Sequence, residues 1–174
     1  MNLERMTVEY HAVEDRMLLR VFFDGTSEIR FWLTRRLVTR IWPILIQLAQ
    51  ATPDIQRQSS PEARQALLGF QHEKALQQVK ISNEPQEPAR EQPLGSEPML
   101  ISQVNARRND HSQTVLSFLP HRGNGIDLAL GDTLLHGLLK LIQESASRAE
   151  WDITLAVPAL DTPTTEPDIR RTVN

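Results

Sequence analysis

Two neighbouring predicted strands alternate arginine with aromatic side chains. Residues 17–23 and 28–33 follow the period of two that is typical of strands, which places Arg20, Phe22, Arg30 and Trp32 on one face. On such a face, nucleic-acid bases can stack on the rings while guanidinium groups contact phosphates. Two further arginines extend the positive charge into the next helix. The candidate residues for binding single-stranded DNA or RNA are therefore Arg20, Phe22, Arg30, Trp32, Arg36 and Arg40.

The same strand residues have a second interpretation, in which they are covered. Phe22 and Trp32 would then pack under an additional helix or a partner chain, with the arginine side chains reaching the edge. The formal net charge of −3 favours this interpretation, because an acidic chain has no overall field that attracts a polyanion. The predicted function is a non-catalytic interaction or adaptor role of unknown pathway, with self-association. Single-stranded nucleic-acid binding is the alternative, and an enzyme of unknown reaction comes third.

Histidines, the usual basis of acid-base and metal chemistry, are scattered along the chain, at His11, His72, His111, His121 and His136. His72-Glu73 begins like a zinc-protease helix, but the position of the second histidine is occupied by Leu76. The neighbours Asp110, His111 and Ser112 are typical of a surface turn, since the members of a catalytic triad meet through the fold. We predict no catalytic residue, no cofactor and no metal site. His136 is expected to be hydrogen-bonded or half-exposed on a helix.

Residues 18–49 and 115–146 share an apolar pattern without a gap. The offset is 97 residues, as the pairing of Ile29 with Ile126 gives (126 − 29). A burial pattern shared over this length indicates one supersecondary unit used twice. The predicted fold class is α+β. It consists of two pseudo-symmetric strand-strand-strand-helix units related by an approximate two-fold, with antiparallel sheets packed against helices and an extra helix before the linker.

Each unit is predicted to be a strand, a hairpin and a helix. The two hairpin strands of the first unit keep their faces in agreement only if the loop around Asp24-Gly25 holds three or five residues, or carries a bulge. Thr34 is the expected N-cap of the first long helix, and Gly131 or Asp132 that of the second. Three strands followed by a helix, twice, resembles the repeat logic of the Whirly and PUR-repeat single-strand binders. The resemblance is one of topology and implies no binding residue.

Boundaries follow from composition shifts. A stretch rich in proline, glutamate and glutamine separates the two units, and a second polar stretch ends the chain. An extra helix opens at Ser59 or Ser60, and residues 151–157 alternate like a closing strand. The prediction is one domain over residues 1–157, made of copy one at about 4–51, the extra helix at about 60–80, a disordered linker at about 82–98 and copy two at about 99–157, followed by a disordered tail at 158–174.

Composition also limits the expected cellular location and the expected partners. The chain has no cysteine, which suits a reducing cytosol and excludes disulfides and thiolate metal sites. No stretch approaches the roughly 18 apolar residues of a membrane span. We therefore expect a cytoplasmic protein without membrane association. Its expected partners are further copies of itself in a homodimer or other homo-oligomer and an unknown protein, with a single-stranded nucleic acid as the alternative.

Overall fold

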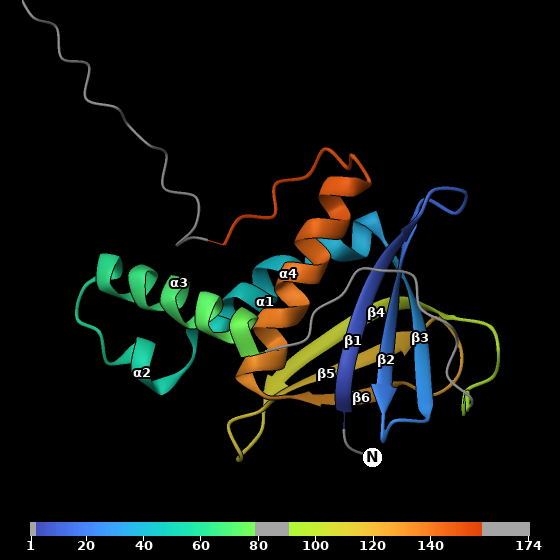
Figure 1. The fold of residues 1–174 in the computed structure, drawn as a ribbon, viewed down its shortest axis with the longest axis horizontal. Helices are drawn as coiled ribbons and strands as arrows, with labels where there is room; N and C mark the ends of the chain where they lie inside the picture. Colours follow the sequence, from blue (N-terminus) through green and yellow to red (C-terminus); the bar gives the residue numbers. More distant parts are fainter. Residues whose placement is uncertain (1–2, 79–90, 158–174) are drawn as a thin grey trace, which may run out of the picture.

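The computed structural model describes residues 3–78 and 91–157. Over these residues the protein is α+β, with one six-stranded sheet in the order β1-β2-β3-β4-β5-β6 and four helices (Figure 1). The strands are β1 Leu3–His11, β2 Arg16–Phe23, β3 Ser27–Thr34, β4 Met99–Arg108, β5 Thr114–Pro120 and β6 Ile126–Leu130. The helices are α1 Arg35–Gln50, α2 Pro53–Gln56, α3 Pro61–Gln78 and α4 Asp132–Arg148.

The sheet consists of two antiparallel three-stranded meanders joined by a parallel pair. β3 and β4 are parallel, with Phe31 opposite Met99 and Trp32 opposite Leu100. The prediction of antiparallel sheets is therefore correct within each meander and wrong at the junction. The reason is the crossover through α1 to α3, which returns the chain to β4 in the direction in which β3 left it. The start of α1 at Arg35 and that of α4 at Asp132 differ by the predicted offset (132 − 35 = 97), whereas the two-fold relation stays a prediction.

The hairpin loop between β2 and β3 has the predicted length. Phe23 lies opposite Ser27, so the loop holds the three residues Asp24, Gly25 and Thr26. Asp24 and Gly25 both have positive φ, at 48° and 72°, a region in which glycine carries no Cβ penalty. The odd loop length keeps the buried faces of β2 and β3 on the same side of the sheet.

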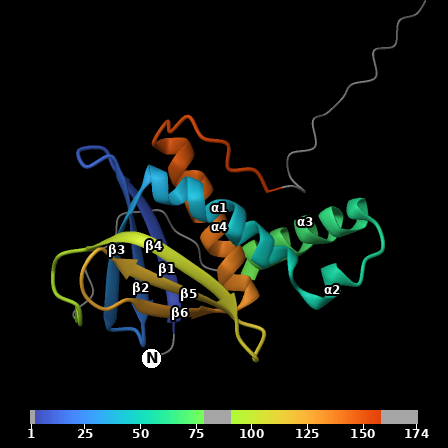
Figure 2. The ribbon, with the colours of Figure 1, turned by 180° about the vertical axis from the view of Figure 1, so that it is seen from behind.

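The core lies between the inner face of the sheet and helices α1 and α4, which pack side by side (Figures 1 and 2). The rings of Phe31 on β3 and Phe118 on β5 stack with centroids 4.8 Å apart, so the core joins the two meanders. The period of two that places Arg20 and Trp32 on one face of the first hairpin assigns six apolar residues to the other face. All six are buried, namely Leu19, Val21, Phe23, Ile29, Phe31 and Leu33. Burial of each such side chain contributes about 1.5–3 kcal/mol.

The helices begin at the predicted residues. The Thr34 hydroxyl accepts a hydrogen bond from the Leu37 amide at the start of α1, and the Ser60 hydroxyl accepts one from the Ala63 amide at the start of α3. Gly131 is the N-cap of α4 and offers no side chain, so Asp132 supplies the acidic group of the first turn.

Residues 151–157 do not form the predicted closing strand. The Trp42 indole donates to the carbonyl of Ala156, and the Gln143 amide donates to that of Leu155. Side chains of α1 and α4 thus occupy carbonyls that a neighbouring strand would need. The alternation still matches the burial, because Trp151 and Leu155 enter the core.

Part of the predicted disordered linker is held against the sheet. The Glu28 amide donates to the Glu91 carbonyl, and the Glu91 amide donates to the carbonyl of Thr26, which forms a parallel bridge at the start of β3. The Thr26 carbonyl and the Glu28 amide have no partner on a neighbouring described strand at this point, and the backbone of Glu91 satisfies both. The remainder of that linker, 82–90, and the predicted tail at 158–174 lie outside the described residues. No helix in the described ranges is long and apolar enough to cross a membrane.

Candidate functional site

The sheet face with the alternating arginine and aromatic residues is covered. We call the side of β1, β2 and β3 that faces away from the core the outer face. Arg20 is only 4% exposed there and Phe22 only 7%, although a nucleic-acid surface would leave both open to solvent. The guanidinium of Arg20 lies against the carboxylate of Glu28, with Nη2 and Oε2 2.7 Å apart. The expectation of an open face is therefore wrong for these two residues.

An ionic network accounts for this burial. Glu28 has a fully buried side chain and also lies 3.4 Å from Nε of Arg30, while Glu9 on β1 lies 3.6 Å from Nη1 of Arg20. Burying a charge is costly unless an opposite charge and hydrogen bonds compensate it. Two carboxylates and two guanidiniums balance formally within the network. A third guanidinium, that of Arg5, lies over the Phe22 ring at 4.1 Å from its centroid and helps to cover it.

Residues beyond the strands cover the remainder of this face. Arg30 donates through Nη2 to the amide oxygen of Gln92 at 3.0 Å and to the carbonyl of Ser96. Trp32 is half-buried, and its ring contacts the His11 ring edge-on with centroids 4.9 Å apart. The arrangement resembles the covered interpretation of the sequence, with the chain's own segment after α3 as the cover.

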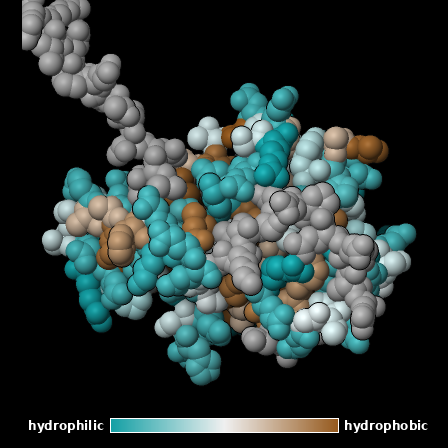
Figure 3. All heavy atoms as spheres, in the orientation of Figure 1, coloured by the Kyte–Doolittle hydropathy of each residue, from teal (hydrophilic) through white to brown (hydrophobic). Residues whose placement is uncertain are grey.

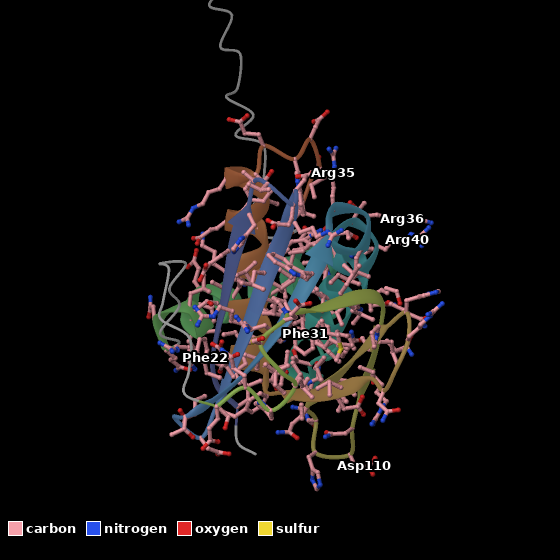
Figure 4. The ribbon with its side chains drawn as sticks, turned by 90° about the vertical axis from the view of Figure 1, so that its right-hand side faces the viewer. Phe22, Phe31, Arg35, Arg36, Arg40 and Asp110 are labelled. Carbon is pink, nitrogen blue, oxygen red and sulfur yellow. The ribbon has the colours of Figure 1, made fainter. Side chains whose placement is uncertain are left out.

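Arg36 and Arg40 lie apart from this network, on the exposed side of α1 (Figure 4). They line a shallow hollow together with the half-exposed Leu100 and the exposed His121. Neither arginine forms an ion pair with another described residue. The six predicted binding residues are therefore divided between a covered sheet face and an open helix face.

Helix α3 has two unlike faces. Leu68, Gly69, His72 and Ala75 are buried on the side toward α4. On the opposite side Phe70 is 62% exposed, an unusual position for a phenylalanine. Helical spacing places Ala63, Ala66 and Leu67 around it, and the apolar atoms at this end of the molecule are visible in Figure 3. Ala66 is exposed like Phe70, whereas Ala63 and Leu67 are half-buried and Leu67 also packs against the core. We call Ala63, Ala66, Leu67 and Phe70 the α3 apolar strip.

The buried face of α3 contains a pair of histidines. Nδ1 of His72 lies 3.1 Å from Nδ1 of His136 on α4, and both side chains are almost fully buried. Burial, and to a smaller extent the neighbouring His72, lowers the pKa of His136 to about 4. The pKa of His72 is also lowered, mainly by burial and then by Lys140. Both rings are therefore neutral at pH 7, and His136 is hydrogen-bonded as expected.

The other candidates for catalysis are not brought together. Residues 109–113 form a surface turn closed by a hydrogen bond from the Asn109 amide to the Gln113 carbonyl, and His111 is exposed on it. His121 is exposed near the hollow beside α1. The described residues contain no group of three or more histidine and carboxylate side chains that could hold a metal ion.

Comparison with known proteins finds no family model, no curated protein and no solved structure that matches the chain. Sequence reasoning missed two features of the residues described above, namely the carboxylate partners of Arg20 and the contact between His72 and His136. The parity that Glu28 shares with Arg30 was a signal for the first, whereas nothing in the local pattern indicated the second.

Proposed function

We propose that the protein is a non-catalytic interaction or adaptor protein that self-associates through the α3 apolar strip. The observation that carries this proposal is the 62% exposure of Phe70 on a helix whose other side is anchored to α4. Exposed aromatic residues within an apolar strip are typical of protein interfaces. The absence of cysteine fits the cytoplasmic location that we propose with it.

The place of α3 in the chain supports a role beyond folding. We propose that the two meander-helix units are copies of one unit, because α1 and α4 begin at the offset that relates the two apolar patterns. α2 and α3 then have no counterpart after α4 within the described residues. An element that is added to one copy, and that exposes a phenylalanine on its outer side, is a natural site for a partner.

The residues of α3 favour a second copy of the chain as that partner. In an antiparallel pairing about a two-fold axis, Phe70 of one copy meets Ala66 of the other, and a small residue leaves room for the ring. The same register sets Lys74 opposite Glu62, so the exposed charges on either side of the strip are complementary. The interface would be isologous, with each copy giving and receiving one phenylalanine.

The substitution Phe70→Asp tests the proposal, with the mass in solution measured by light scattering. Val13→Asp is the matched control, because Val13 is 95% exposed in the β1–β2 turn, away from α3. We expect a dimer mass for the wild type and for Val13→Asp, and a monomer mass for Phe70→Asp. Losing two buried phenylalanines would weaken association by about a hundred-fold or more. A monomeric wild type, or a Phe70→Asp variant that is still a dimer, would contradict the proposal.

A second candidate function, single-stranded nucleic-acid binding, is favoured by one observation. Arg36 and Arg40 are exposed one helical turn apart beside the partly exposed Leu100. The double variant Arg36→Glu/Arg40→Glu should abolish binding of a short oligonucleotide at low salt, whereas Arg57→Glu, at an exposed position of the α2 end, should not. The absence of binding by the wild type at low salt would exclude this function.

A further inference from the structure

We propose that His72 and His136 form a pH-sensitive latch, which holds α3 against α4 at neutral pH and releases it in mild acid. The latch is a property of the helix contact and holds whether or not the chain associates. Where the proposed function also holds, the latch regulates it, because the α3 apolar strip moves with the helix.

The geometry of the two rings limits their protonation. At 3.1 Å between the two Nδ1 atoms, one nitrogen donates its proton and the other accepts it through its lone pair. The accepting ring must therefore lack a proton on Nδ1. Protonation of both rings would set two N–H groups against each other and break the hydrogen bond. Protonation of one ring would keep the bond but leave a charge in a buried place.

The surrounding charges do not compensate such a buried cation. α3 contributes Glu73 and Lys74, α4 contributes Asp132 and Lys140, and α2 contributes Asp54. Asp132 is already engaged, because Arg108 on β4 donates to its Oδ1 at 2.8 Å. Lys140, which pairs with Glu144 at 3.2 Å, opposes protonation of His72, and Glu73, which favours it, has the smaller effect. Among the residues lining the adjoining hollow, α1 contributes no ionisable side chain.

The contact that the latch holds is small. Besides the histidine, the buried residues of α3 are Leu68, Gly69 and Ala75, and one of these has no side chain. By comparison, α1 buries seven residues, including Trp42. A helix with so little buried apolar surface can detach without unfolding of the core. The state of the histidine pair is therefore able to decide whether α3 is docked.

Hydrogen exchange of the α3 amides across pH tests the latch, after correction for the intrinsic effect of pH on exchange. We expect their protection in the wild type to fall by up to about tenfold per pH unit and per histidine as the pH falls from 6.5 toward 4, while α1 amides stay protected. His136→Gln, which keeps a polar side chain that does not titrate, should remove most of this dependence. His111→Gln, at an exposed histidine, is the matched control and should keep it in full.

Constant α3 protection between pH 7 and 4.5 in the wild type would overturn the latch, as would an unchanged pH dependence in His136→Gln. If that variant leaves α3 undocked at every pH, NMR titration of the His72 and His136 imidazoles in the wild type provides the test instead. Ordinary titration of both rings near pH 6.5 with α3 still protected would contradict the latch, whereas depressed values coupled to loss of protection support it. The same exchange measurement on the monomer expected for Phe70→Asp separates the latch from self-association, because the latch predicts an unchanged pH dependence there.

Discussion

Two buried polar clusters of the protein differ in their charge, since one consists of ion pairs and the other of neutral rings. Under the outer face of the sheet, Arg20 and Glu28 are buried as ions, and each has an opposite charge within hydrogen-bonding distance. Between α3 and α4, His72 and His136 are buried as neutral rings that share one hydrogen bond. The first cluster sets each buried charge beside an opposite one. The second cluster keeps its hydrogen bond free of a buried charge only while both rings are neutral.

This difference separates a part of the fold that is expected to persist in mild acid from a part whose docking depends on pH. The ionic cluster joins β1, β2, β3 and the segment at Gln92, so its loss affects the sheet itself. The histidine pair joins one peripheral helix to the body (Figure 1). We infer that conditions near pH 5 leave the sheet intact while loosening α3. The following predictions test that separation, from the largest expected effect to the smallest.

Replacing Glu28 by glutamine should be the most damaging of these changes. The variant leaves the Arg20 guanidinium buried without its closest counter-charge, and breaking one side of a buried ion pair costs about 3–5 kcal/mol. Urea unfolding measures the loss. Asp127→Asn is the control, because its ion pair with Arg107 is exposed at 3.8 Å and should contribute less than about 1 kcal/mol. Similar losses in the two variants would show that the outer cluster is not buried in solution.

The histidine pair should make stability depend on pH. The folded-state pKa of His136, about 4, lies below the ordinary 6.5, so unfolding takes up a proton between these values. The stabilisation is present in full above pH 6.5 and is lost as the pH falls toward 4, by up to about 3 kcal/mol for this histidine. Urea unfolding at several pH values measures the slope, which His136→Gln should reduce. An equal slope in that variant would assign the dependence to other groups.

Much of the fold could be predicted because local periodicity determines it. Alternation identified the buried side of the first hairpin, and the parity of that pattern required the odd loop that Asp24, Gly25 and Thr26 form. The caps at Thr34 and Ser60 followed from short-range hydrogen bonding between a hydroxyl and a nearby amide. The parallel junction and the irregular path of residues 151–157 depend on contacts distant in sequence, which local patterns do not contain.

The burial of the outer face could be predicted only in part from the sequence. Glu28 has the same parity as Arg30, so the pattern already placed a carboxylate beside the arginines, and this signal was missed. The cover itself comes from Gln92 and Ser96, more than sixty residues away along the chain. The histidine pair is a similar case, since His72 and His136 are 64 residues apart and on different helices. Only the docking of α3 brings them together.

Gln92 offers a milder test of the ionic cluster. Its amide nitrogen donates to Glu28 at 3.3 Å and its oxygen accepts from Arg30 at 3.0 Å. Replacing it by alanine should cost about 1–3 kcal/mol, since hydrogen bonds to charged groups are stronger than neutral ones. Hydrogen exchange at the backbone bridge between Ser27 and Glu91 should accelerate. Gln103→Ala, at an exposed position of β4, is the control, and an equal loss there would contradict a special role for Gln92.

The double replacement of Arg20 and Glu28 by methionine should have the smallest effect. Removing both partners leaves no unpaired charge between them, and apolar side chains of similar length can fill the space, so stability should stay within about 1 kcal/mol of the wild type. Glu9 and Arg30 lose their ion pairs with the replaced residues, but their side chains are 17% and 16% exposed, and Arg30 keeps its hydrogen bond to Gln92. Combined with the single variants in a double-mutant cycle, the urea data give the coupling energy of the pair. A loss as large as that of Glu28→Gln would mean that the sheet needs the charges themselves, whereas near-neutrality would mean that each charge is needed only because the other is present.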